Sequence, residues 1–264
     1  MRKTFCGWYF KCQSDTQTLA VIPAVHGKSH SIQLITDGGA WNFTDVGNCI
    51  FSKSGFKIDL EENGISAAGE VKFGELTPIK SHIMGLFKYV PFMQCRHCVL
   101  SMSHSVNGLV SVNGTDYEFT DGLGYIEGDR GYSFPREYAW TQCFFEGGSL
   151  MFSVAGIPFL GLHFTGIVGV IMWQGREYRL ATYCGAKAIK ISDGEIVILQ
   201  GKYVFRAKLI EKHAHPLNAP VDGSMVRTIQ ESASCRAAYS FEKNGKTLFE
   251  FETDRASFEY EYGG

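Results

Sequence analysis

Two carboxylates lie two residues apart in the most distinctive stretch of the chain, residues 124–143, GYIEGDRGYSFPREYAWTQC. If residues 125–129 form a β-strand, its two-residue period places Tyr125, Glu127 and Asp129 on one face. Two carboxylates on one apolar face repel each other, so one of them is expected to keep its proton at neutral pH. A protonated carboxyl is the group that general acid catalysis on an apolar substrate requires. We therefore predict Asp129 and Glu127 as the catalytic residues.

A purely structural role for the acid pair is the alternative. In that interpretation Asp129 forms an ion pair with Arg130 or Arg136 at a well-packed corner of a β-protein. Gly128 separates the two acids and Gly131 follows them, and both glycines favour a bulge or tight turn that would re-aim the side chains. The residues alone leave both interpretations open.

Aromatic side chains are frequent in the same stretch and near the start of the chain, and they can line a substrate pocket. A ring that faces a developing carbocation contributes up to about 2 kcal/mol when it is desolvated, whereas core packing is the commoner role of any single ring. Pro135 disfavours helical geometry at Phe134, and we expect a short helical turn over residues 135–142 with Tyr138 and Gln142 on one side. The predicted substrate-binding residues are Trp8, Tyr9, His97, His104, Tyr125, Tyr132, Tyr138, Trp140 and Gln142.

Two histidines of this set lie in the longest predicted strand, residues 95–106, CRHCVLSMSHSV. Alternation places His97 and Ser101 on one face of that strand and Cys98 and His104 on the other. At most one of the two histidines therefore points into a given cavity, where it would help to orient the acid.

Metal, nucleotide and hydrolase sites are disfavoured by the spacing of the residues that would form them. Cys95 and His97 face away from Cys98 if the strand alternates, whereas zinc requires four converging ligands. The glycines of residues 122–131 lack the Lys-Ser/Thr of a phosphate loop, and Ser133 lacks a nucleophile elbow. We predict no metal site.

Strand and turn signals dominate the whole chain, and no amphipathic helical period is found. The dipeptides Asn107-Gly108, Asn113-Gly114 and Asn244-Gly245 predict tight hairpin turns. Many short strands at regular spacing predict an all-β protein, an antiparallel barrel or sandwich. The glycine pair that follows Glu146 is the best boundary, and it divides the chain into residues 1–146 and 147–264.

Composition limits the partners and the compartment. The chain has 264 residues, of which 45% are hydrophobic and 20% charged, enough to form a substantial core. The net charge of 25 − 27 = −2 does not favour nucleic acid or an anionic surface as a partner. We find neither a secretory signal pattern nor a run of about 18 apolar residues that would span a membrane. The 8 cysteines lack a secreted spacing and predict reduced thiols and a cytoplasmic location.

Three segments together resemble one family. GYIEGDRGYSFPREYAW, with Gln142, resembles the Asp–Gly–Ser-Phe-Pro–Trp signature of the tocopherol cyclase-like family. The opening GWYFK, residues 7–11, is similar to the start of that family, and APVDGSM, residues 219–225, with RTIQE, residues 227–231, resembles its C-terminal loop. The three matches fall in order and span nearly the whole chain.

The resemblance implies two tandem lipocalin-like antiparallel β-barrel or half-barrel units. It also implies an isomerase, an intramolecular cyclase that works without a cofactor by acid-catalysed cyclisation, or hydration, of an isoprenoid substrate. Asp129 or Glu127 would donate the proton, Gln142 and a histidine would orient it, and the protein would collect its apolar substrate by transient membrane contact. Two alternatives stay open: a lipocalin-like binding protein for an apolar small molecule, and a shape-selective pericyclase.

Overall fold

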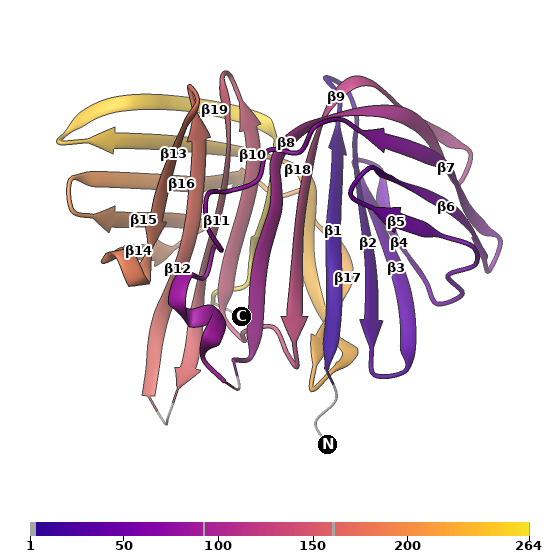
Figure 1. Cartoon of the computed structure of the whole chain (residues 1–264), viewed down its shortest axis with the longest axis horizontal. Coiled ribbons are helices and arrows are strands. Elements are labelled where there is room, and N and C mark those ends of the chain that lie inside the picture. Colours follow the sequence, from indigo (N-terminus) through magenta and orange to yellow (C-terminus); the bar gives the residue numbers. More distant parts are fainter. Residues whose placement is uncertain (1–3, 92, 160–161, 264) are drawn as a thin grey trace. The chain divides into compact units, whose positions relative to one another are not determined.

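The computed structural model describes residues 4–91, 93–159 and 162–263, and most of them belong to antiparallel strands (Figure 1). Nine strands form the first sheet, in the order β4-β3-β2-β1-β9-β8-β7-β6-β5. Their bounds are β1 (Phe5–Gln13), β2 (Thr18–His26), β3 (Ser29–Thr36), β4 (Gly39–Phe43), β5 (Ile50–Ser52), β6 (Gly55–Glu62), β7 (Ile65–Phe73), β8 (Cys95–Val112) and β9 (Thr115–Gly131).

The second sheet repeats this connectivity, in the order β13-β12-β11-β10-β19-β18-β16-β15-β14, with β17 paired to β18. Its strands are β10 (Tyr138–Phe145), β11 (Gly148–Phe159), β12 (Leu162–Trp173), β13 (Arg176–Ala181), β14 (Lys187–Ser192), β15 (Glu195–Gln200), β16 (Tyr203–Glu211), β17 (His215–Val221), β18 (Ser224–Lys243) and β19 (Lys246–Tyr260). Two short 3₁₀ helices, η1 (Gly85–Tyr89) and η2 (Thr182–Cys184), complete the described elements. The predicted all-β class with tandem lipocalin-like units is confirmed. Among the described residues, no helix has the length and apolarity that a membrane crossing needs.

Tight turns were predicted well, with one error. Asn113 and Asn244 have φ of 49° and 53°, and glycines with positive φ follow them, as a type I′ hairpin turn requires. Asn107-Gly108 is no turn, because β8 runs through it without ending. Gly108 instead lies where the β8–β9 register shifts, and a Cβ there would be 2.2 Å from the carbonyl oxygen of Glu70. This glycine permits close strand approach, which is the other structural use of glycine in a strand.

Two compact units divide the chain, but not at the predicted boundary. Unit 1 consists of Met1–Ile79, Cys95–Ser133 and Leu217–Thr228, and unit 2 contains the remainder. The predicted boundary between residues 146 and 147 falls at the β10–β11 hairpin turn, whose two strands pair with each other in the second sheet.

The helical turn predicted over residues 135–142 is absent, and β10 occupies most of that range. Pairing to β11 on one side and to β19 on the other satisfies the β10 backbone as a strand. Such long-range pairing overrides the weak local preference for a turn.

In each unit, one side chain links strands near the two ends of the sheet by hydrogen bonds. In unit 1, the Glu62 carboxylate of β6 accepts hydrogen bonds from the backbone N–H and the hydroxyl of Thr44, just after β4, at 2.6 and 2.7 Å. In unit 2, the Gln200 amide of β15 accepts from Ala181 N at 2.9 Å and donates to Arg179 O at 3.0 Å. These bonds satisfy backbone groups at strand edges that would otherwise be unpaired.

The core of unit 1 occupies one face of its sheet, where Phe10, Cys12 and Ile126 are buried with other apolar side chains. The alternate positions on the same strands belong to the opposite face. That face carries buried polar side chains, among them Lys11 and Glu127. Buried polar groups require partners, so this second face is where a functional site is expected.

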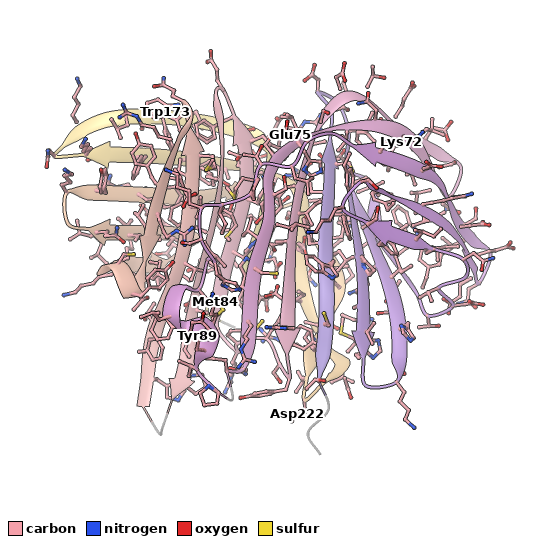
Figure 2. All side chains as sticks on the ribbon, in the orientation of Figure 1. Lys72, Glu75, Met84, Tyr89, Trp173 and Asp222 are labelled. Atoms are coloured by element: carbon pink, nitrogen blue, oxygen red, sulfur yellow. The ribbon has the colours of Figure 1, made fainter. Side chains whose placement is uncertain are left out.

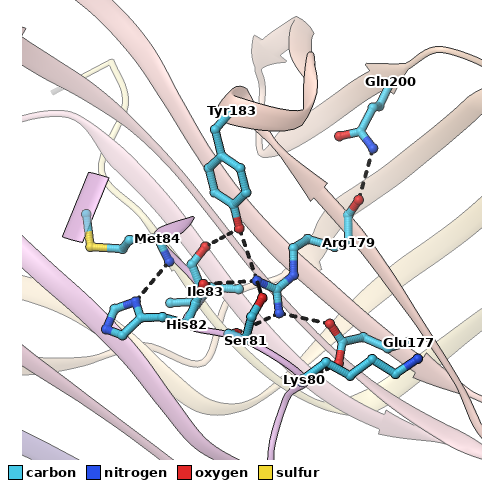
Figure 3. A network of polar contacts seen from close by, with 9 residues as sticks. All are labelled: Lys80, Ser81, His82, Ile83, Met84, Glu177, Arg179, Tyr183 and Gln200. Atoms are coloured by element: carbon cyan, nitrogen blue, oxygen red, sulfur yellow. Dashed lines mark hydrogen bonds and ion pairs between the residues drawn. The ribbon is translucent and has the colours of Figure 1, made fainter. Parts of the chain in front are cut away.

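In unit 2, residues 80–91 form a strap, and Arg179 of β13 holds the start of it (Figure 3). The Arg179 guanidinium donates to Ser81 Oγ and His82 O at 2.9 Å, and to Ser81 O and a Glu177 carboxylate oxygen at 2.8 Å. The Arg179 and Glu177 side chains are only 12% and 5% exposed, so this ion pair is shielded from solvent.

Replacing Arg179 by alanine should lower the free energy of unfolding by about 2 kcal/mol, because buried Glu177 and two carbonyl groups lose their donor. Urea denaturation measures the change. The control is Arg206→Ala, which removes an ion pair to Glu242 from an arginine that is 42% exposed, and it should cost less than about 1 kcal/mol. Equal losses in the two variants would show that the Arg179 network does not hold the strap.

Candidate active site

The predicted shared face of the acid stretch is confirmed within unit 1. β9 pairs with β1 without a register shift from Gly131 opposite Phe5 to Leu123 opposite Gln13, so alternate β9 residues keep to one face. On that face, the Tyr125 hydroxyl donates a hydrogen bond to Glu127 Oε2 at 2.5 Å. Both side chains are buried.

His97 of β8 lies between the two carboxylates. Its Nδ1 is 3.0 Å from Asp129 Oδ1 and its Nε2 is 3.2 Å from Glu127 Oε2. The Cys95 thiol also donates to Asp129 Oδ1, at 3.2 Å. Asp129 is the most accessible of the three charged groups, with a side-chain exposure of 22% against 12% for His97 and 7% for Glu127. Asp129 is therefore the charged group of the cluster that solvent reaches most easily.

The two carboxylates set the charge of His97. Burial acts to lower the His97 pKa, but the charges of Glu127 and then Asp129, with their hydrogen bonds, outweigh it and raise the pKa well above its ordinary value. A raised pKa favours the imidazolium form, in which Nδ1 donates a hydrogen bond to Asp129 and Nε2 forms an ion pair with Glu127. The sequence predicts that a proton on one carboxyl relieves the repulsion between the acids, whereas in the structure the His97 ring lies between them.

Donors at both ends of this cluster remain protonated. Burial, and then the charge of Glu127, raise the pKa of the Tyr125 hydroxyl well above its ordinary value. Burial, and then the charge of Asp129, do the same for the pKa of the Cys95 thiol. The cluster thus runs from Tyr125 through Glu127, His97 and Asp129 to Cys95, and each carboxylate lies between one hydroxyl or thiol donor and the His97 ring. Arg130, the alternative partner of Asp129, follows it on β9 and belongs by alternation to the opposite face.

Irregular pairing of β8 changes the predicted faces of that strand. Its register against β9 shifts between Val99 and Ser101 and again between Ser101 and His104, so Ser101 lies on the face of His104 and not on that of His97. His104 Nδ1 is 3.0 Å from Ser101 Oγ, and the ring packs edge-on against Phe73 at 4.7 Å. His104 therefore lies on the core side, and burial lowers its pKa to about 4.

Of the predicted aromatic residues in unit 1, Tyr9 joins the acid face and Trp8 does not. Tyr9 is buried and pairs directly with Glu127 across β1 and β9. Trp8 pairs with Gly128, and a Cβ on Gly128 would be only 2.8 Å from the Trp8 ring. The glycine between the acids thus makes room for the indole on the other face. Tyr132 follows β9, and its carbonyl accepts a hydrogen bond from Gly223 N at 2.6 Å.

The remaining predicted site residues, Tyr138, Trp140 and Gln142, belong to β10 of unit 2 and lie on one face of it. The Tyr138 hydroxyl donates to a Glu259 carboxylate oxygen. Burial and then the charge of Glu259 raise the Tyr138 pKa well above its ordinary value. Trp140 pairs with Glu259 across β10 and β19.

The same His97, Glu127 and Asp129 offer one nitrogen and two oxygen atoms within 4.8 Å of one another, a set that a metal ion can use. However, both ring nitrogens of His97 face carboxylate oxygens, and a metal would have to displace a proton from one of them. Cys98, considered with Cys95 and His97 as a ligand, instead donates to Gly128 O on the opposite face. The arrangement fits an ion-paired imidazolium better than a set of metal ligands.

The structure brings together three of the predicted site residues, Glu127, Asp129 and His97, and adds Cys95, which the sequence did not assign to the site. Cys95 was considered only as a metal ligand, although the same alternation that pairs it with His97 also aims its thiol at the acid face.

Solved structures share this fold across the whole chain. A putative AttH from Nitrosomonas europaea is 9% identical, with a TM-score of 0.51 over 99% of this chain and 93% of that one. Kievitone hydratase from Nectria haematococca is 10% identical, with a TM-score of 0.56 over 98% and 89%. CghA with Sch210972 is 7% identical, with a TM-score of 0.61 over 98% and 88%. No protein-family model and no curated protein matches the chain, so these likenesses show the fold alone.

The pKa values of half-buried His97 and buried His104 should be shifted in opposite directions from about 6.5. Because the folded pKa of His97 is raised, its stabilisation is complete below about pH 6.5 and is lost as the pH rises through the folded pKa. Because the folded pKa of His104 is lowered to about 4, it favours the folded state above about pH 6.5, and this contribution is lost as the pH falls toward 4.

NMR titration of the imidazole Cε1 protons, assigned with His97→Gln and His104→Gln, measures both. An imidazole of His97 that deprotonates near pH 6.5 would contradict the ion-paired cluster.

Proposed function

We propose that the protein is a cofactor-independent enzyme that cyclises or hydrates an apolar, isoprenoid or prenylated substrate by acid–base catalysis, in the manner of a tocopherol cyclase-like isomerase. The observation that carries the proposal is the position of His97, within 3.2 Å of both Glu127 and Asp129 on a buried polar face. A cluster of this kind holds a proton that it can give and carboxylates that can take one back.

Both reactions need one proton given and one taken. In cyclisation, a proton adds to a carbon of the double bond, the substrate's hydroxyl oxygen attacks the other carbon, and that oxygen loses its proton. In hydration, water takes the place of the hydroxyl. Asp129, as the most accessible member, would exchange protons with the substrate. His97 would supply Asp129 through Nδ1, and Glu127 would hold the ring through Nε2. Tyr9, opposite Glu127, would present a ring to the positive charge.

The similar structures support this reaction class through their names only. One is called a hydratase of kievitone, and another contains Sch210972. The fold alone supports several chemistries, so the acid cluster and not the likeness carries the proposal.

A lipocalin-like carrier is the main rival, and a shape-selective pericyclase is the third candidate. A carrier of an apolar molecule has no use for a buried and a half-buried carboxylate joined by a histidine, because charged groups are costly to desolvate. A pericyclase needs shape and would tolerate the loss of either acid. The effect of removing an acid from the cluster therefore distinguishes the enzyme, the carrier and the pericyclase.

The proposed partner and compartment have weaker support. All eight cysteines are free thiols, which favours a reducing compartment such as the cytoplasm. Leu86 and Tyr89 of η1 are 78% and 71% exposed, and they are suited to the brief membrane contact that would collect an apolar substrate.

Co-sedimentation with lipid vesicles should therefore decrease in a Leu86→Ser/Tyr89→Ser variant.

Asp129→Asn and Glu127→Gln should each lower turnover by at least roughly 100-fold, which corresponds to about 2.7 kcal/mol of barrier. Each amide keeps the shape of the acid and removes its charge, so substrate affinity should change far less. The measurement is single-turnover conversion of a prenylated phenol, alongside a binding titration of the same compound.

Glu118→Gln is the matched control, since Glu118 lies on the same strand and is exposed, and it should react at the wild-type rate. Normal turnover in both acid variants would refute the acid mechanism and favour the pericyclase. Tight binding with no conversion of any prenylated phenol by the wild type would favour the carrier.

A further inference from the structure

A seam opens inside the second sheet where two paired strands separate. β10 and β19 pair from Ala139 opposite Tyr260 to Gln142 opposite Ser257. β10 continues to Phe145 and β19 begins at Lys246, so their remaining edges face each other without ladder pairing. A pocket of about 630 Å³ lies in this seam, between the end of β10, the β12–β13 turn and residues 249–253.

The corresponding place in unit 1 is closed by a side chain. There the Gln17 amide of the β1–β2 turn donates to Asp116 O at 2.8 Å and accepts from Glu118 N at 3.1 Å, and so joins the turn to β9. In unit 2, the β10–β11 turn is Glu146-Gly147, which brings a carboxylate to the seam in place of an amide. The two units share a strand order but differ here.

Aromatic rings form one wall of the pocket. The Phe145 ring lies 4.7 Å from Phe249 and 4.8 Å from Phe251, and Trp173 meets Phe249 edge-on at 5.7 Å. All four side chains are only half-buried, so part of each ring remains accessible to a ligand. Figure 2 labels Trp173, at the end of β12.

The charged residues that line the pocket are all acidic. Three of its lining residues are glutamates, Glu146, Glu250 and Glu252, and no Lys, Arg or His is among the described residues that line it. Glu252 already accepts from Arg236 Nε at 2.5 Å, whereas Glu146 and Glu250 are exposed at the rim. Acidic side chains around exposed rings favour a positively charged guest.

We propose that this seam pocket binds an organic cation, an amine or quaternary ammonium group carried on an apolar body. Aromatic faces attract such a cation through their quadrupoles, and the rim carboxylates add a Coulombic contribution. The volume lies in the range of small-molecule sites. The pocket contains no residue of the acid cluster, so its binding of a cation does not depend on the proposed reaction.

Choline and its neutral isostere 3,3-dimethylbutan-1-ol form a matched pair of probes. Binding is followed by NMR of the Trp173 indole N–H, which Trp173→Phe assigns by its disappearance. Choline should shift this resonance saturably and bind roughly fivefold or more tightly than the alcohol. Glu250→Gln should weaken choline binding and leave the alcohol unchanged. Asp193→Asn removes an exposed charge from the β14–β15 turn of the same unit and should leave both unchanged.

Three results would overturn the inference. Equal binding of choline and the alcohol would show an apolar pocket without cation preference. A choline affinity lowered as much by Asp193→Asn as by Glu250→Gln would show attraction to net charge and no specific site. The third result is a Trp173 resonance that does not shift when choline is in roughly 100-fold excess over the protein, an excess that reveals millimolar binding. That result would show that the pocket binds no choline.

Discussion

The imidazolium of His97 between Glu127 and Asp129 is the interaction on which the candidate site depends. Two carboxylates on one buried strand face repel each other, and each loses hydration that the protein must replace. A single ring offsets both effects, because its Nδ1 donates a hydrogen bond to Asp129 at 3.0 Å and its Nε2 lies 3.2 Å from Glu127 as an ion pair. Tyr125 and Cys95 then donate from the outer ends. Removing the ring would leave like charges facing each other, so the group acts as a unit.

Strand irregularity, and not local sequence, brings the imidazole to the acids. Counted back from the Asn113-Gly114 turn without any shift, the β8–β9 hairpin would set His97 opposite Arg130, on the wrong face. Three register shifts along β8 set it opposite Asp129 instead. Bulges of this kind re-aim side chains and are common beside active sites. The shared face of Glu127 and Asp129 could be predicted because β1 and β9 pair without a shift, whereas the pairing of His97 could not.

The difference between local and long-range determinants also explains which parts of the fold could be predicted. Turns such as Asn113-Gly114 and Asn244-Gly245 are local, since positive φ is required within the dipeptide itself. Asn107-Gly108 is the same dipeptide, but its pairing to β7 and β9 keeps it in a strand. Residues 138–142 form a strand because β11 and β19 lie on either side. Where partners distant in sequence decide the conformation, local pattern fails.

The two sheets share one strand order but carry different polar side chains, so the fold alone does not determine the chemistry of a site. Both units place a buried glutamate on the strand corresponding to β9, and in each a tyrosine hydroxyl donates to it, Tyr125 to Glu127 and Tyr138 to Glu259. In unit 2 the residue opposite Glu259 on β18 is another acid, Glu231, where unit 1 sets His97 beside its acids. Only unit 1 therefore joins a carboxylate pair through an imidazole among the described residues. A likeness at 7–10% identity conveys the shared scaffold, while the capacity to give and take a proton depends on the side chains placed on that scaffold.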